Sequence, residues 1–208
     1  EVFRTDYHLK GNWNEKIFKN ENPIVLELGC GKGEYTVGLA EKYTKKNFIG
    51  IDIKGARLWR GAKTAHQAGL INVAFLRTRI ENITSFFSID EVSEIWITFP
   101  DPQLKRIRAT KRLTSSIFLN HYKTFLRKDG IIHLKTDSIE LHRYTRKIVE
   151  LNKLKIHSCT DDLYGTFHDD PILSIKTFYE EQYLDKGLPI TYLSFELSND
   201  GQIVETIG

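Results

Sequence analysis

Residues 23–43 read PIVLELGCGKGEYTVGLAEKY, and this stretch decides the fold. Its first part, 23–29, is a short apolar run that ends in glycine, which is typical of a buried strand. Its second part, 34–43, has apolar residues such as Val37 and Ala40 at helical spacing. The glycines between the two parts permit a tight turn and let the backbone approach a ligand closely. The stretch therefore predicts a strand that passes directly into a helix.

The same alternation of strand and helix continues along the chain. The other expected strands are 47–53, 72–76, 94–99, 131–136 and 190–197. The other expected helices are 56–69, 115–130, 139–152 and a short one near 177–186, after a polar loop at 160–172. Strands that alternate with helices of this length favour a parallel sheet with right-handed crossovers. We therefore expect one doubly wound, Rossmann-like α/β domain over 23–208, preceded by an N-terminal extension, 1–22, that we expect to be flexible.

The composition excludes several classes of protein. A chain of 208 residues, 40% of them hydrophobic, can bury one substantial core. It has no apolar run near the roughly 20 residues that cross a bilayer, and its polar start shows no signal peptide. Two cysteines form neither a disulfide framework nor a C-x-x-C zinc motif, and the seven histidines are scattered. We therefore expect a cytoplasmic protein with no metal site and no membrane contact.

Positive charge is concentrated in one segment. The net charge is only +3, but residues 102–128 contain eight lysines and arginines and no acid. The rest of the chain therefore carries a net charge of −5. A basic block on an otherwise acidic protein is a candidate footprint for a polyanion. The alternative is a solvated helix face, although such a face usually mixes both signs.

The glycine-rich turn and two acids point to one kind of ligand at the carboxyl ends of the first two strands, where doubly wound sheets bind ligands. Gly29, Gly31 and Gly33 form G-x-G-x-G, not the G-x-G-x-x-G of dinucleotide sites. Glu27 would repel a pyrophosphate but suits a cationic amino acid. Asp52 can accept both hydroxyls of a ribose, or it can cap the next helix. Together they favour S-adenosylmethionine over NAD and resemble the E-x-G-x-G-x-G signature of class I methyltransferases.

The loop after the strand 94–99 begins with Pro100, Asp101 and Pro102. Proline fixes its own φ and excludes helix from the preceding residue, so the carboxylate of Asp101 is held stiffly. Such an acid suits an electrostatic or positioning role at a reaction centre, and the alternative is an ordinary Asp-Pro turn. The basic run follows at once, and lysine and arginine supply nucleic-acid affinity that does not depend on sequence. We therefore expect a methyltransferase whose substrate is a nucleic acid.

The stretch FPDPQLKRIRATKRL (99–113) resembles the F-P-D-P-W-x-K-x-R-x-x-K-R-R hallmark of the bacterial tRNA (guanine-N7)-methyltransferases, the TrmB family. HLKTD (133–137) and TFYEEQY (177–183) resemble two further motifs of that family, and the likeness runs from about 23 to 197. The resemblance implies a class I S-adenosylmethionine-dependent methyltransferase domain, with a mostly parallel sheet and an antiparallel C-terminal strand. It implies tRNA as the partner and N7 of a guanine as the methyl acceptor, by resemblance the variable-loop guanine at position 46.

The resemblance also implies roles for individual residues. It implies that Asp101 is the catalytic carboxylate, next to both donor and guanine. The donor-binding residues that it implies are Glu27, Gly29, Gly31, Asp52, Asp101, Glu81 and Asn82, the last two as candidates for contact with the adenine. The residues that it implies for contact with the tRNA are Lys105, Arg106, Ile107, Arg108, Lys111, Arg112, Asp137, Thr177, Phe178, Tyr179 and Glu180.

Two of these segments have a structural alternative. Asp137 with Glu140 has the spacing of a helix capping box, and so has Thr177 with Glu180. Capping alone would explain these residue types, although a cap and a binding residue can coincide.

The chain departs from the family pattern in two places. Gln103 stands where the family has an aromatic residue, and Leu104 stands where proline commonly follows. Any stacking by that aromatic must therefore come from elsewhere or be absent. After the strand 72–76, simple counting places 79–80 where the family has an acidic-small pair, so that Glu81 or Asn82 would serve only after a local shift.

Three other functions compete with this interpretation. The first is a methyltransferase of another RNA base or of a small molecule, which the identity of the product would reveal. The second is an NAD(P) oxidoreductase, against which Glu27 and the glycine spacing count. The third is a non-catalytic RNA-binding protein, although the chain retains both the donor motif and Asp101. We expect a monomer or homodimer with no obligate protein partner.

Overall fold

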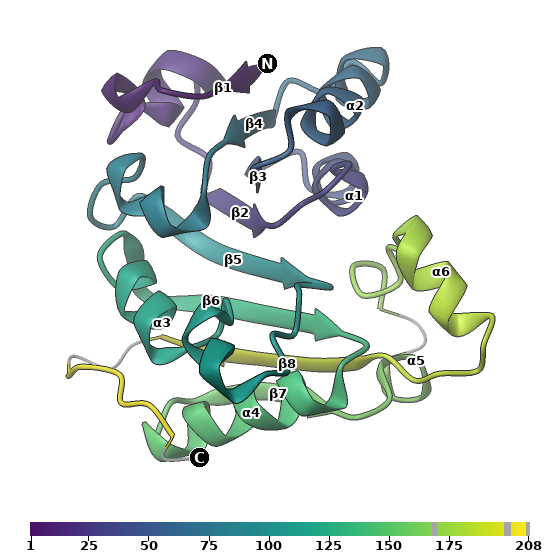
Figure 1. The fold of residues 1–208 in the computed structure, drawn as a ribbon. Helices are drawn as coiled ribbons and strands as arrows, with labels where there is room; N and C mark the ends of the chain where they lie inside the picture. Colours follow the sequence, from purple (N-terminus) through teal and green to yellow (C-terminus); the bar gives the residue numbers. More distant parts are fainter. Residues whose placement is uncertain (168–169, 198–200, 207–208) are drawn as a thin grey trace.

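The computed structural model describes residues 1–167, 170–197 and 201–206, and its centre is an eight-stranded sheet with the order β1-β4-β3-β2-β5-β6-β8-β7 (Figure 1). The strands are β1 (Val2–Phe3), β2 (Ile24–Leu28), β3 (Asn47–Asp52), β4 (Val73–Arg77), β5 (Val92–Thr98), β6 (Leu126–Thr136), β7 (Ile156–Thr160) and β8 (Thr191–Glu196). Neighbouring strands from β1 through β6 run parallel, whereas β8 is antiparallel to both β6 and β7. The predicted mostly parallel sheet with an antiparallel C-terminal strand is confirmed.

The sheet has its switch point between β2 and β5. From β2 the chain winds outward through β3 and β4, and it then returns to β5 and winds the other way through β6. The carboxyl ends of β2 and β5 therefore lie side by side, with Leu28 paired to Ile97. In this topology a crevice opens between the loops that follow those two strands.

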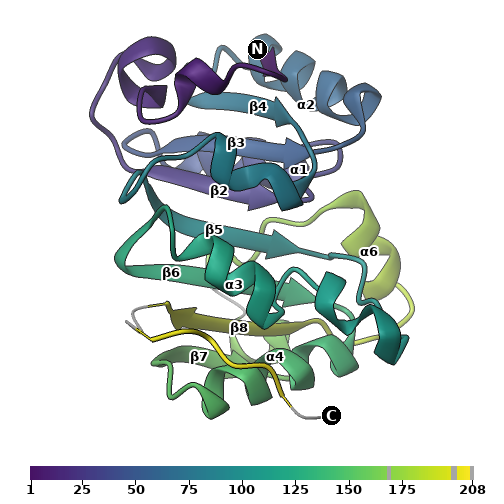
Figure 2. The same ribbon diagram turned by 60° about the vertical axis from the view of Figure 1, so that its left-hand side comes forward.

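Helices cover both faces of the sheet (Figures 1 and 2). The α-helices are α1 (Glu34–Lys42), α2 (Gly55–Gln67), α3 (Ser116–Tyr122), α4 (Ile139–Leu151), α5 (Leu163–Thr166) and α6 (Phe178–Leu184). Side chains alternate along each strand, so Leu26 and Ile49 face the core that contains Phe118 of α3, whereas Val25 and Phe48 face the core beneath α1. None of the helices in the described ranges has the length and apolar character needed to span a membrane.

The N-terminal segment 1–22 packs against the sheet. Strand β1 extends the sheet beside β4. Trp13 is fully buried, and its indole N–H donates to the carbonyl of Phe86 at 3.0 Å. Leu9 and Phe18 belong to the same core. Residues that we expected to be a flexible extension therefore contribute large apolar side chains to one face of the molecule.

The helix predicted over 115–130 is too long. Helix α3 ends at Tyr122, and β6 begins at Leu126. Leu126 pairs with Val92 and Ile131 pairs with Glu94, so residues 127–130 bulge out of the ladder. The bulge places Asp129 at φ 63°, which a helix interior would not allow. Gly130 therefore belongs to a bulged strand and does not end a helix.

Candidate active site

The glycine-rich turn joins β2 to α1 with three left-handed backbone conformations. Gly29, Gly31 and Gly33 have φ values of 75°, 56° and 72°, which favour glycine. A Cβ atom on Gly29 or Gly31 would meet no atom within 4 Å, whereas one on Gly33 would lie 2.6 Å from the ring of Phe75. Gly33 is therefore needed for close packing of the turn, and the first two glycines border open space.

That open space consists of two cavities that meet at Gly29. The first, of about 450 Å³, is lined by Glu27, Gly29, Cys30, Gly31, Lys32, Glu34, Arg57, Thr98, Phe99, Thr177, Phe178 and Tyr179. The second, of about 290 Å³, is lined by Gly29, Asp52, Ile53, Thr78, Arg79, Ile80, Glu81, Lys111, Leu113 and Phe118. Both cavities open at the carboxyl ends of the strands, where the sequence predicts the ligand.

Glu27 lies at the base of the first cavity and is almost fully buried. Its carboxylate accepts hydrogen bonds from the hydroxyls of Thr36 and Thr98, the latter at 2.6 Å. Burial raises the pKa of Glu27 to about 7, although both hydroxyls act in the opposite direction. An acid held in this way favours a cationic partner, because the partner would offset the cost of burying the negative charge.

Asp52 ends β3 and lines the second cavity. One carboxylate oxygen accepts from the backbone N–H of Gly31 at 3.0 Å, and the other accepts from the N–H of Lys54 at 2.8 Å. Asp52 therefore ties the glycine-rich turn to the start of α2 and still borders the cavity. The N-cap of α2 is Lys54, so Asp52 braces the turn before the helix without capping it, and the ribose contact of Asp52 stays a prediction.

Of the two candidates for contact with the adenine, Glu81 and Asn82, the segment after β4 brings only Glu81 to the lining of the cavity. This segment forms a 3₁₀ helix, η3 (Ile80–Ser85). Glu81 lines the second cavity opposite Asp52. Asn82 follows in the same turn, where its backbone N–H donates to the carbonyl of Arg79 at 3.0 Å.

Asp101 lies in a loop with a tightly constrained backbone. Phe99 and Gln103, on either side of it, have φ values of 47° and 46°, conformations that cost a non-glycine residue about 1–3 kcal/mol each. The Asp101 carboxylate is exposed and accepts from the N–H of Gln103 at 3.0 Å. Phe99 lines the first cavity, and Asp101 follows it two residues later in the sequence, just outside the residues that line the cavity.

Arg112 holds this loop in place. Its guanidinium donates to the carbonyls of Pro102 and Gln103, at 3.2 and 3.3 Å, and lies 4.2 Å above the ring of Tyr144. Half-buried in these contacts, Arg112 supports the backbone that carries Asp101. The sequence predicted a contact with RNA for Arg112. The structure shows that Arg112 also supports the loop through the carbonyls of Pro102 and Gln103.

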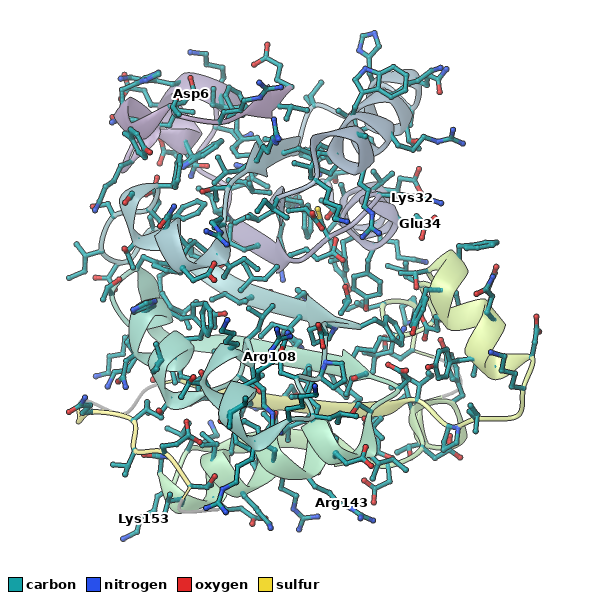
Figure 3. All side chains as sticks on the ribbon, viewed as in Figure 1. Asp6, Lys32, Glu34, Arg108, Arg143 and Lys153 are labelled. Carbon is teal, nitrogen blue, oxygen red and sulfur yellow. The ribbon has the colours of Figure 1, made fainter. Side chains whose placement is uncertain are left out.

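The remainder of the basic run forms a 3₁₀ helix, η4 (Arg106–Lys111), on the surface. Lys105, Arg106 and Arg108 are exposed, and Ile107 is 88% exposed. Lys111 turns toward the second cavity. Figure 3 labels Arg108 on this loop, and Lys32 and Glu34 where the glycine-rich turn enters α1. The predicted basic footprint therefore lies directly beside the crevice.

A buried ion pair fixes the wall opposite the glycine-rich turn. Lys135 of β6 is fully buried, and its ammonium lies 2.8 Å from the carboxylate of Glu180. The same ammonium donates to the carbonyls of Leu173 and Ile175, at 2.9 and 3.0 Å. Burial lowers the pKa of Lys135, while Glu180 acts in the opposite direction.

This pair was not predicted from the sequence. Its signal was a lysine within the apolar strand IIHLKT (131–136), because a charge in a buried strand requires a partner. The partner, Glu180, is also fully buried, so it supports the cavity wall from behind, while Thr177, Phe178 and Tyr179 line the cavity itself.

The two capping alternatives have different outcomes. Thr177 caps α6 through a hydrogen bond from the N–H of Glu180, and the Glu180 carboxylate accepts from the N–H of Thr177, so this capping box is confirmed. For α4 the capping alternative is wrong, because Ser138 is the N-cap and accepts from the N–H of Leu141. Asp137 remains at the end of β6, where the Tyr179 hydroxyl and Asp137 together hold the pKa of Tyr183 above its usual value.

Comparison with known proteins identifies the family. Residues 21–193 match the family described as "Putative methyltransferase". The chain is 55% identical to the tRNA (guanine-N(7)-)-methyltransferase of Bacteroides thetaiotaomicron, over 98% of the chain and 80% of that protein. The chain belongs to the tRNA (guanine-N(7)-)-methyltransferase family. A second member, from Christiangramia forsetii, is 57% identical over 92% of the chain and 86% of its own length.

Solved structures agree on the fold of this family member. A 16S rRNA methyltransferase, KamB, superposes with a TM-score of 0.68 over 89% of the chain and 92% of its own length, at 15% identity. A protein described as an S-adenosylmethionine-dependent methyltransferase of Aquifex aeolicus superposes with a TM-score of 0.58, at 14% identity. The predicted Rossmann-like methyltransferase fold is confirmed, and so is the resemblance to the family.

Proposed function

We propose that this protein transfers a methyl group from S-adenosylmethionine to N7 of a guanine in tRNA, giving 7-methylguanosine, and that the target is the variable-loop guanine at position 46. One observation carries the proposal. In a chain more than half identical to enzymes named for this reaction, a crevice at the switch point lies between an acid-bearing glycine-rich turn and the basic loop that holds Asp101.

The residues around the two cavities fit the donor. Gly29 and Gly31 leave room where any Cβ would intrude on the ligand. Glu27, buried at the base of the first cavity, suits the ammonium of the methionine part. Asp52 and Glu81 border the second cavity, where they can accept from ribose hydroxyls and from the adenine amine. When bound, the donor supplies an electrophilic methyl group on a sulfonium.

The acceptor needs placement more than activation. N7 of guanine carries an in-plane lone pair and no proton, so no general base is required to create the nucleophile. Holding N7 in line with the methyl group supplies a proximity effect of up to roughly 7–11 kcal/mol in favourable cases. The product guanine is cationic, so Asp101 and Asp137 assist by accepting from its N1–H and exocyclic amine and by offsetting the developing charge.

The wall formed by the start of α6 holds the base against the donor. Thr177, Phe178 and Tyr179 face the first cavity, and Phe178 and Tyr179 are 59% and 47% exposed. The Tyr179 ring packs edge-on against Phe99, and the Lys32 ammonium lies 5.4 Å from the centre of the Phe178 ring. Glu180 acts through the backbone of Thr177 and through Lys135 and is a positioning residue. Phosphates next to the target lie along Lys105, Arg106, Arg108 and Lys111.

The test is methyl transfer from labelled S-adenosylmethionine to unmodified tRNA, followed by mass spectrometry of the nucleosides. We expect 7-methylguanosine as the product. Asp101→Ala should lower turnover by orders of magnitude and leave tRNA affinity within about twofold, because the carboxylate acts mainly in the transition state. Another methylated nucleoside would overturn the choice of acceptor atom. Equal loss of turnover and tRNA binding in Asp101→Ala would overturn its catalytic role.

A further inference from the structure

We propose that the exposed face of α2 is a second RNA-contact surface, which binds phosphates of the tRNA outside the target loop. This inference rests on the proposed function and extends it to a surface that lacks the family's basic motif. We call this surface the α2 basic face and define it as Lys54, Arg57, Arg60 and Lys63.

The sequence around α2 forms a second acid-free block. From Ile53 to Ile80 there is no Asp or Glu, whereas six lysines and arginines occur. The cations of the α2 basic face recur every three residues, a spacing that keeps successive side chains on neighbouring parts of one helix surface. A helix face that merely stayed solvated would usually mix the two signs.

The packing of α2 directs these charges outward. Leu58, Gly61 and Ala65 are buried against the sheet. Arg57, Arg60 and Lys63 lie on the exposed side of the same helix. Among the residues that the structure describes, no carboxylate forms an ion pair with the α2 basic face, so its positive charge is available to a ligand.

Helix α4 provides the contrast. It has the same length, 13 residues, but its exposed side carries both signs, with Arg146 paired to Glu150 at 2.7 Å. It lies at the opposite end of the molecule from α2, as Figures 1 and 2 show. The concentration of positive charge on α2 is therefore not a general property of surface helices in this protein.

The α2 basic face is continuous with the proposed active site. Arg57 and Lys32 line the first cavity, beside the start of α6. Arg60 and Lys32 line an adjoining groove of about 440 Å³. Two acids, Glu34 and Glu41, line the same groove, and the carboxylate of Glu34 accepts from the N–H of Phe178 at 3.0 Å. Cations thus extend from the cavity mouth over α2, with the acids confined to the α1 side.

A polyanion much longer than one nucleotide explains this arrangement. The basic loop with η4 flanks the cavities on one face of the sheet, and the α2 basic face flanks them on the other. When the target base lies in the cavities, the RNA strand that carries it would run along the basic loop. A neighbouring part of the folded tRNA would then lie over α2. Phosphates spaced along RNA match a row of separate cations better than a single small anion would.

Charge removal tests the proposal with a matched control. Arg60→Ala/Lys63→Ala should raise the Kd for tRNA about tenfold and reduce the slope of log K against log salt by about 1.5–2, because each lost phosphate contact removes close to one unit. Arg143→Ala/Lys147→Ala removes the same charge from exposed positions of α4 and should change neither quantity by a comparable amount. Equal effects of the two double variants, or no effect of the first, would overturn the proposal.

Trp59 provides a direct readout of contact. It is 60% exposed on α2, with the ammonium of Lys63 5.3 Å from its ring centre, whereas the other two tryptophans, Trp13 and Trp96, are buried. Bound tRNA should lower the acrylamide quenching constant of the tryptophan fluorescence at least twofold, and Trp59→Phe should abolish this protection. Unchanged quenching at saturating tRNA would contradict RNA contact with α2.

Failure of this inference and failure of the proposed function give different results. If tRNA is not the substrate, wild-type protein forms no 7-methylguanosine and tRNA fails to protect Trp59. If only the α2 contact is wrong, wild-type protein methylates tRNA normally and the α2 double variant has wild-type KM and salt dependence. A raised KM for tRNA with unchanged kcat in the α2 variant is the expected result.

Discussion

At the scale of single residues, Glu27 shows how burial couples a ligand site to stability. Its pKa in the folded protein is about 7, above the ordinary value of 4.5. The folded state therefore holds the proton more tightly than the unfolded state. The contribution of Glu27 to stability is complete below pH 4.5 and declines as the pH rises toward 7, by about 3 kcal/mol in total.

Glu27→Gln should remove this decline. We expect the variant to lose less stability than the wild type between pH 5 and pH 8, since the amide does not ionise. Urea unfolding of both proteins at the two pH values measures the difference. The same pH dependence in both proteins would show that Glu27 ionises normally in the fold.

The Lys135–Glu180 pair should be sensitive to loss of one partner. Lys135→Met leaves the Glu180 charge buried without its counter-ion, which we expect to lower the free energy of unfolding by about 3–5 kcal/mol. Lys135→Met/Glu180→Gln removes both charges and should be less destabilised than Lys135→Met alone. Denaturant unfolding of the wild type and the three variants, with Glu180→Gln completing the cycle, checks this. Additive losses would contradict a direct coupling.

Residues whose roles depend on local sequence could be predicted, and those that depend on distant partners could not. Glu27, Asp52 and the first two glycines follow from one strand-turn-helix pattern, and the structure brings them to the cavities. In the sequence, Arg112 cannot be distinguished from the other cations of the basic run, because its contacts with Pro102 and Tyr144 depend on the fold. Its support of the loop therefore could not be predicted.

At the scale of elements, the basic loop divides into a binding part and a supporting part. Arg108→Ala removes an exposed charge and should reduce the salt slope of tRNA binding by about 1, with kcat unchanged. Arg112→Ala should instead lower kcat about tenfold or more, because the backbone around Asp101 loses its two side-chain hydrogen bonds.

Arg112→Lys supplies the control for charge. It keeps the positive charge but cannot reproduce the forked contacts of a guanidinium, so it should lower kcat nearly as much as Arg112→Ala. Steady-state kinetics with saturating donor separate the two outcomes. Recovery of kcat in Arg112→Lys, or a salt slope as shallow as that of Arg108→Ala, would assign Arg112 to RNA binding alone.

The elements that could be predicted are those with a clear periodic pattern of apolar residues or with a capping motif in the local sequence. Strands β2 to β5 were predicted to within about two residues, whereas β1 was not predicted and β6 begins five residues earlier than expected. The capping box of α6 follows from Thr177 and Glu180 alone. The helix predicted over 115–130 was too long because the apolar residues Phe125 and Leu126 continue its pattern. Only pairing with β5, through a bulge, shows that Leu126 belongs to a strand.

At the scale of the whole molecule, the distribution of charge is more informative than its sum. A net charge of +3 conceals two acid-free blocks, one after β5 and one over α2. The sheet order brings the loops of both blocks to the same edge, where the two cavities open. The sequence predicted the first block as an RNA footprint, but the meaning of the second depends on a topology that only the fold supplies.

The measurement that tests the central claim most directly replaces one atom of the substrate. A tRNA carrying 7-deazaguanine at the variable-loop position lacks the N7 lone pair but keeps the Watson–Crick edge and the phosphates. In single-turnover assays with labelled S-adenosylmethionine, the unaltered tRNA should be methylated, and the 7-deaza tRNA should bind with similar Kd and receive no methyl group. Methylation of both tRNAs at the same rate would contradict transfer to N7 of that guanine.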